Sequence, residues 1–246
     1  MKLRIKFKKH GPVRFIGHLD VMRYFQKAIR RAGIDVTYSA GFSPHQVMSF
    51  AAPLGVGLES NGEYMDIQVN SLPAATADMT SCELLVWRLN AVGVSGLEAV
   101  SARILPENAG NAMASVAAAA YTVRFREGRA PHIDLQTALD DFLAGEEILI
   151  TKETKRGVRE VNLRPGIYEL DWHDGAFHML LDASSAGNIK PVQVIEAFLA
   201  HCGEVLQENA LLVTREDVYT YCDPQDSQVE HRFVSLGEIG DMGGVL

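Results

Sequence analysis

Two short stretches between residues 14 and 45 carry the side chains best suited to chemistry. In the first, Arg14 precedes Gly17-His18-Leu19-Asp20, where a helix is predicted to begin. The free N–H groups and positive dipole end of a helix N-terminus bind phosphates readily. His18 beside Arg14 is therefore a candidate to contact a phosphate or to shuttle a proton. In the alternative interpretation, Asp20 merely stabilises the first helical turn and His18 packs locally.

The second stretch reads Tyr38-Ser39-Ala40-Gly41-Phe42-Ser43-Pro44-His45. Glycine allows close backbone approach to a ligand, and His45 supplies a polar ring. Tyr38 and Phe42 are of the type that stacks on nucleic-acid bases. Glycine and proline mark turns of every kind, so a tight turn with Phe42 in the core is the alternative.

The helix that separates the two stretches is predicted over residues 19–32. Its apolar residues follow one stripe at helical spacing, and its basic residues lie off that stripe and face outward. Basic residues late in a helix suit its negative dipole end, but four within nine positions exceed what capping requires. The apolar stripe is Leu19, Met22, Phe25, Ile29 and Ala32, and the basic residues are Arg23, Lys27, Arg30 and Arg31.

Positive charge is concentrated at the start of the chain. Residues 1–50 carry ten lysines and arginines against two acidic residues, a net charge of +8, whereas the whole chain carries −8. This segregation indicates a surface for a polyanion on an otherwise acidic body. The alternative is that the surfaces of this region are basic without a ligand. Residues 2–8 alternate between apolar and basic types, which predicts a strand with a basic outer face, and such lysines also protect edge strands from aggregation.

A second basic cluster follows at residues 152–164. Lys155 and Arg156 lie in a predicted loop, and Arg164 follows in Asn162-Leu163-Arg164-Pro165. This cluster is a further candidate to bind a phosphate backbone. A solvated loop tip is the alternative.

No established catalytic signature is present. The chain lacks a Gly-x-Ser-x-Gly elbow, a Walker loop, an HExxH helix and a dinucleotide fingerprint. Glu63 and Asp66 lie three apart on a predicted strand, so they point to opposite faces and form no acid–base dyad. The three cysteines, at scattered positions, have neither metal-ligand spacing nor an iron–sulfur pattern, so no metal and no cofactor are expected.

The composition is that of an ordinary globular protein, with 47% hydrophobic and 22% charged residues. No apolar run is long enough to span a membrane, and the basic start of the chain lacks the continuous apolar segment of a signal peptide. We therefore expect a cytoplasmic protein without a membrane partner.

The order of predicted elements indicates an α+β fold of two tandem ferredoxin-like units with antiparallel sheets. Residues 1–108 alternate as strand, helix, strand, strand, helix, strand, which is the split βαβ pattern. Residues 112–222 repeat this order, with a hairpin predicted at Asp174-Gly175. Residues 223–246 are acidic and glycine-rich, and are expected to form a flexible tail.

The two motif regions together resemble a known bacterial family. The resemblance is carried by Arg14-Phe15-Ile16-Gly17-His18-Leu19-Asp20, by Tyr38-Ser39-x-Gly41-Phe42-x-Pro44-His45, by Phe50-Ala51-x-Pro53-Leu54 and by Glu63-Tyr64-x-Asp66. The chain is similar to the radical-SAM-linked proteins, an uncharacterised family whose members occur beside or fused to a radical SAM protein. The resemblance implies a separately encoded radical SAM partner, because this chain has no CxxxCxxC motif.

Three functions are compatible with these features. The leading hypothesis is an accessory, substrate-binding protein, not an enzyme on its own, that holds RNA (tRNA or rRNA) for a radical SAM enzyme. The second is a metal-independent RNA-processing or RNA-modifying enzyme, with His18 and His45 as acid and base and Arg14 or Lys27 stabilising charge. Asp20 is a further catalytic candidate. The third is a protein–protein adaptor for the radical SAM partner, in which the basic face meets an acidic protein.

Overall fold

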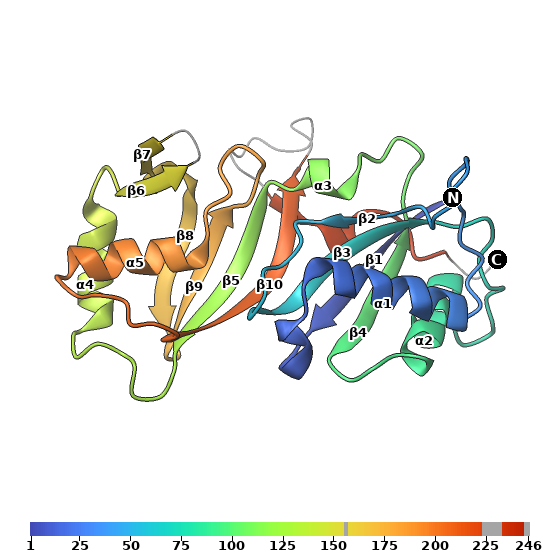
Figure 1. Cartoon of the computed structure of the whole chain (residues 1–246), viewed down its shortest axis with the longest axis horizontal. Coiled ribbons are helices and arrows are strands. Elements are labelled where there is room, and N and C mark those ends of the chain that lie inside the picture. The colour runs from blue at the N-terminus through green and yellow to red at the C-terminus, as the bar shows by residue number, and fades with distance from the viewer. Residues whose placement is uncertain (155–156, 223–232, 244–246) are drawn as a thin grey trace. The chain divides into compact units, whose positions relative to one another are not determined.

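A computed structural model describes residues 1–154, 157–222 and 233–243 of the chain (Figure 1). The fold is mixed α+β and mostly antiparallel, as predicted. It divides into two units, one of residues 1–117 and 217–246 and the other of residues 118–216. The predicted boundary between residues 108 and 112 lies a few residues before this division.

Unit 1 contains four strands of an antiparallel sheet and two long helices from the first half of the chain. The strands follow the order β4-β1-β3-β2. Both helices contribute to one hydrophobic core with β1, β3 and β4, so they cover the same face of the sheet (Figure 1). The elements are β1 (Lys2–Lys9), η1 (Gly11–Phe15), α1 (His18–Arg31), β2 (Met48–Ala51), β3 (Glu59–Gln68), α2 (Ser81–Ala91), β4 (Leu97–Ile104) and α3 (Ala112–Ser115).

The core of unit 1 follows the period-two pattern of β1. Leu3, Ile5 and Phe7 are almost fully buried beneath the helices. From α1, Phe25 and Ile29 are buried as predicted. Leu19, which was expected in the apolar stripe of α1, is 58% exposed. That expectation was wrong because the buried face of the first turn is centred on Val21 instead. Gly33 ends the helix with φ +62°, a conformation that favours glycine.

The basic residues of β1 do not form a solvent-facing surface. Arg4 is buried and makes a two-pronged ion pair with Asp66 of β3, with its Nε 2.8 Å from Oδ1 and its Nη2 3.0 Å from Oδ2. Asp66 also accepts the N–H of Ala112. Lys2 donates to the carbonyl of Ala109, and Lys6 pairs with Asp217 at 3.0 Å. The charge of this strand is therefore used to hold other segments against the sheet.

Residues 233–243 are built into unit 1. Residues 223–246 were expected as a flexible tail, but their described part contains β11 (Phe233–Ser235), paired with β10 (Leu211–Tyr221), and η4 (Leu236–Glu238). Ser235 Oγ donates to Asp217 at 2.8 Å, and Tyr64 donates its hydroxyl to the same carboxylate. Burial, followed by the Asp217 charge, raises the pKa of Tyr64, so this hydroxyl remains a donor.

In unit 2 the antiparallel strands follow the order β10-β5-β9-β8. Residues 211–216 of β10 belong to this unit and the rest of that strand to unit 1. The predicted turn at Asp174-Gly175 is confirmed, with positive φ at both residues. The remaining elements are β5 (Ala118–Phe125), α4 (Leu135–Ala144), β6 (Leu149–Thr154), β7 (Gly157–Asn162), η2 (Arg164–Gly166), β8 (Ile167–His173), β9 (Ala176–Asp182) and α5 (Pro191–His201).

The Arg4–Asp66 pair yields a stability prediction. An Arg4→Met substitution leaves the Asp66 carboxylate buried without its countercharge, so we expect the free energy of unfolding to fall by about 3–5 kcal/mol. Urea denaturation measures this loss. The matched control is Arg23→Met, which breaks an exposed Arg23–Asp20 pair and should cost less than about 1 kcal/mol. Equal losses in the two variants would contradict the prediction.

Candidate nucleic-acid interface

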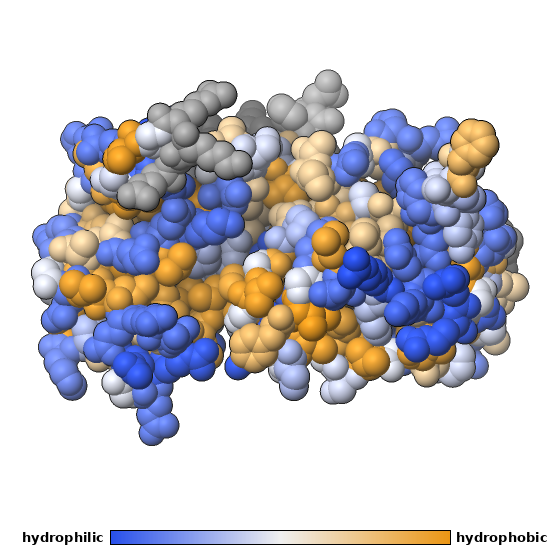
Figure 2. All heavy atoms as spheres, viewed as in Figure 1, coloured by the Kyte–Doolittle hydropathy of each residue, from blue (hydrophilic) through white to orange (hydrophobic). Residues whose placement is uncertain are grey.

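The exposed side of α1 carries the four basic residues predicted from the sequence. Arg23, Lys27, Arg30 and Arg31 are all exposed, and Figure 2 shows strongly hydrophilic side chains gathered over this helix. Arg23 pairs with Asp20 at 3.2 Å across one turn, and Arg31 donates to the carbonyl of Val92 at 3.1 Å. Within the described part of the chain, the side chains of Lys27 and Arg30 make no hydrogen bond or ion pair. The helix thus presents basic side chains that are not used in polar contacts with the residues that the structure describes.

The loop of residues 38–45 is a hairpin-like excursion next to this helix. Its base is held by the bridge between Tyr38 and Gln46 and by the Thr37 N–H, which donates to Gln68 of β3 at 2.7 Å. Ser39 and His45 join the two sides of the loop. The Ser39 hydroxyl lies 2.8 Å from the His45 Nδ1, and the His45 backbone N–H donates to the same hydroxyl. The loop is therefore ordered by its own polar contacts.

Gln46 ties the loop to α1. Its side chain is buried, and its Nε2 donates to the carbonyl of Gln26 at 3.0 Å. Its Oε1 is buried without a partner among the described residues. Sequence reasoning missed Gln46, because nothing distinguishes a glutamine after a loop from any solvated residue. This contact attaches the base of the loop to the middle of α1.

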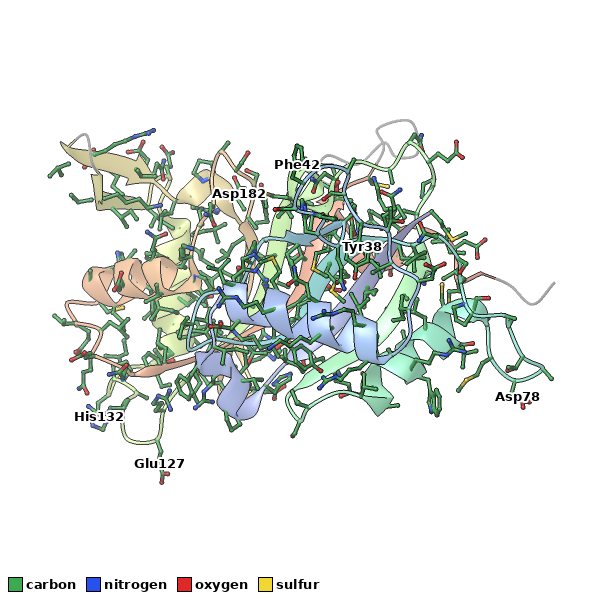
Figure 3. All side chains as sticks on the ribbon, turned by 45° about the vertical axis from the view of Figure 1, so that its right-hand side comes forward. Tyr38, Phe42, Asp78, Glu127, His132 and Asp182 are labelled. Carbon is green, nitrogen blue, oxygen red and sulfur yellow. The ribbon has the colours of Figure 1, made fainter. Side chains whose placement is uncertain are left out.

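The two aromatic residues of the loop are exposed. Phe42 is 110% exposed at the loop tip and Tyr38 is 49% exposed (Figure 3). The alternative in which Phe42 fills the core is therefore wrong. Burial of this exposed phenylalanine against a ligand would be favourable. The loop thus offers two exposed aromatic rings, and its base is attached to α1 through Gln46.

Arg14 lies at the end of η1 and is held by Glu59. Its Nη1 is 3.0 Å from Glu59 Oε1, which also accepts the Gly11 N–H at 2.9 Å. The guanidinium stacks over the Phe15 ring, 4.8 Å from its centroid. Arg14 is one-quarter exposed. Its charge is therefore partly neutralised, unlike that of the outward residues of α1.

His18 is the first residue of α1 and packs against the core. Its ring meets Phe50 edge-on, with the centroids 5.0 Å apart. It lines a cavity of about 10 Å³ together with Lys9 and Glu63, enough room for about one water molecule. Lys9 is buried and donates to the carbonyl of Ile16 at 3.0 Å. The burial of Lys9 could have been predicted from the sequence, because Lys9 continues the alternating inward positions of Leu3, Ile5 and Phe7.

The structure gives His18 and His45 different surroundings. His18 contacts the core at the start of α1, whereas His45 is exposed in the loop that Gln46 attaches to Gln26. Residues 18 and 26 are separated by about 12 Å along a helix axis at 1.5 Å per residue. Asp20 is exposed and paired with Arg23. No contact among the described residues joins these three catalytic candidates.

The second basic cluster lies in unit 2. Lys155 and Arg156 fall outside the described residues, and Arg164 begins the short helix η2. The neighbouring Asn162 accepts the N–H groups of Ile148 and Arg164 through its Oδ1, each at 3.0 Å. Residues 157–159, expected in the same loop as Lys155 and Arg156, belong to β7 instead, because the N–H and C=O groups of this strand pair with β6. Asn162 thus fixes the turn that precedes Arg164.

Comparison with known proteins gives a family but no activity. Residues 2–191, more than half of the chain, match a family described as "Uncharacterized protein conserved in bacteria (DUF2344)". The chain belongs to this family. A search of curated proteins finds no match. Within the described residues, no group of three potential ligands could hold a metal ion, and no helix is long and apolar enough to cross a membrane.

Glu59 provides a pH-dependent test of how Arg14 is positioned. Partial burial acts to raise the pKa of Glu59, but the Gly11 N–H and the Arg14 guanidinium outweigh it and hold the pKa below its usual 4.5. A lowered folded-state pKa contributes stability above the unfolded pKa, and this contribution is lost as pH falls through the folded value. We expect Glu59→Gln to cost roughly 1 kcal/mol at pH 7.

The cost should shrink below about pH 4.5, where the native carboxylate also becomes protonated. Urea denaturation of both proteins between pH 7 and pH 3 measures the difference. A difference that stays constant across this range would contradict the assignment.

Proposed function

We propose that this protein is an RNA-binding accessory protein that holds tRNA or rRNA for a separately encoded radical SAM enzyme. The observation that carries the RNA part is the attachment of the loop bearing Phe42 to the basic helix α1. The radical SAM part comes from the resemblance of residues 14–66 to the radical-SAM-linked proteins. The two parts can be tested separately.

Free cations on one helix, together with exposed aromatic rings on the loop attached to that helix, fit single-stranded or looped RNA. Basic side chains contact the phosphates without regard to sequence, and each base that stacks on an aromatic ring contributes about 1–3 kcal/mol. Lys27 and Arg30 supply uncommitted charge, and Tyr38 and Phe42 supply ring faces. An acidic protein partner would use the cations but leaves the exposed rings without a role.

The contacts of the candidate residues favour binding over catalysis. A general acid and a general base must both reach the reacting group through a hydrogen bond of about 2.6–3.2 Å or through one water. His18 packs on Phe50, and His45 is engaged with Ser39 in the loop. The RNA-processing hypothesis is therefore the weaker alternative.

The fold is compatible with this role. The strand orders β4-β1-β3-β2 and β10-β5-β9-β8, each with two helices in the sequence of a split βαβ unit, support two ferredoxin-like units. We infer this finer description from the strand orders. Fold alone does not determine function, so the proposal depends on the surface of α1 and its loop.

The cations of α1 can be tested with a charge-reversal variant. Lys27→Glu with Arg30→Glu should lower affinity for a fluorescent single-stranded RNA of about 12 nucleotides by 10–100-fold at low salt. The slope of log affinity against log salt should fall by roughly 1.4, because each lost contact with a single strand accounts for about 0.7. Fluorescence anisotropy from low to high salt measures both quantities.

The matched control is Arg124→Glu with Arg126→Glu, an equal charge change at exposed positions of unit 2. It should leave affinity close to that of the native protein. An equal loss in both variants would mean that only net charge matters, and no binding by the native protein at low salt would contradict the RNA proposal.

The aromatic loop makes a separate prediction. Phe42→Ala should weaken RNA binding by about tenfold through the loss of one stacked base, without a change in the salt slope. Its melting temperature should not change, since the side chain is fully exposed. Phe42→Trp should retain binding because it keeps a ring face. Equal affinities of the Ala and Trp variants would exclude stacking by Phe42.

A further inference from the structure

Unit 2 contains a groove that the RNA proposal does not use. The groove has a volume of about 620 Å³ and lies between α5 and the β6 strand. Phe142 and Ile148 are buried at its floor, and the small residues Ala197 and Ala200 line it from α5. Figure 2 shows hydrophobic side chains gathered over α5. The volume is in the range of sites that bind ligands or short peptide segments.

One wall of the groove is the edge of a strand. β6 pairs with β7 in a sheet that has two strands within the described residues. Residues in an antiparallel pair alternate between those that bond their partner and those whose N–H and C=O groups point away. The Leu163 N–H donates to the Ile148 carbonyl at 2.8 Å, so residue 148 belongs to the bonded set. Leu149 and Thr151 therefore direct their backbone groups to the free edge.

The free edge and the groove coincide. Leu149, Ile150 and Thr151 all line the groove, as expected when the edge of a strand faces it. An exposed strand edge is a template for another extended chain, and natural proteins usually cover or disrupt such edges. Here a helix stands opposite the edge at a distance that leaves a groove between them. A strand beside a helix-lined groove is a known geometry for peptide recognition.

The side chains around the groove define the chemistry of its occupant. Leu149 is 49% exposed and offers an apolar contact. Glu147 and Glu196 line the groove and are exposed, whereas its lining contains no lysine or arginine from the described residues. His201 is paired with Asp141 at 2.8 Å. The groove therefore suits a segment with aliphatic side chains on one face and basic side chains along its length.

We propose that the groove binds an extended segment of a partner protein, which adds to the edge of β6 as a third strand. The segment's backbone bonds the outward N–H and C=O groups of Leu149 and Thr151. Its aliphatic side chains pack on Ala197 and Ala200, and its basic side chains meet Glu147 and Glu196. This inference is independent of the RNA surface, which lies in unit 1.

Proline scanning of the two hairpin edges tests the proposal in the full-length chain. The probe is a synthetic peptide of about seven residues, a typical strand length, that alternates valine and lysine. Isothermal titration calorimetry measures its affinity. Thr151→Pro removes an outward N–H without removing a bond between β6 and β7, so the hairpin should persist. We expect it to weaken binding about tenfold.

The matched control is Glu160→Pro, which makes the same change on the outer edge of β7 and should leave affinity unchanged. Ala200→Phe fills the groove and should weaken binding as strongly as Thr151→Pro. A peptide that alternates valine and glutamate should bind less tightly because it meets Glu147 and Glu196. Circular dichroism verifies that every variant is folded.

Three results would overturn the proposal. The first is no binding of the valine–lysine peptide to the native chain at millimolar concentration. The second is equal affinity of the native and Thr151→Pro proteins. The third is a concentration-dependent dimer that Thr151→Pro dissociates, which would show that a second copy of this chain occupies the edge.

Discussion

The buried ion pair between Arg4 and Asp66 is the constraint on which unit 1 depends. The two residues lie directly opposite each other on β1 and β3, and a slip of one strand by one residue would turn its charged residue toward the helix-covered core and separate the pair. The pair therefore fixes the register of the two central strands. Asp66 also accepts the N–H of Ala112, so the same carboxylate positions the segment that leaves β4. With the register set, β1 and β3 present a continuous apolar face to α1 and α2.

This pairing also changes what the basic start of the chain means. Arg4, Lys6 and Arg14 are engaged with carboxylates, so much of the charge in residues 1–50 is structural. What remains for a ligand is the outer side of α1. The sequence shows that positive charge is concentrated in residues 1–50, but it does not show which of these charges are paired. The acidic partners Glu59 and Asp217 lie later in the chain. A charge count therefore overstates a binding surface wherever the fold supplies the opposite charge.

The elements that follow a local period were predictable, and those that depend on distant contacts were not. The alternation in β1, the helical spacing in α1 and the turn at Asp174-Gly175 all gave correct elements. The short strands β7 and β11 were missed because their residues have no apolar period and become strands only by pairing. For the candidate site, sequence identified the aromatic and basic residues, whereas the Gln46–Gln26 contact that joins them could be seen only in the structure.

The course of the chain through unit 1 has a consequence for the order of folding during synthesis. Tyr64 and Lys6 are made early, but both donate to Asp217, and Ser235 completes that network from β11. The ribosome must synthesise all of residues 118–216 before Asp217 and Ser235 emerge. When the first part of unit 1 has been synthesised, its donors to Asp217 therefore still lack their acceptor. Unit 2 is one continuous segment of the chain and can fold first. The N-terminal unit would then be the last to reach its native state.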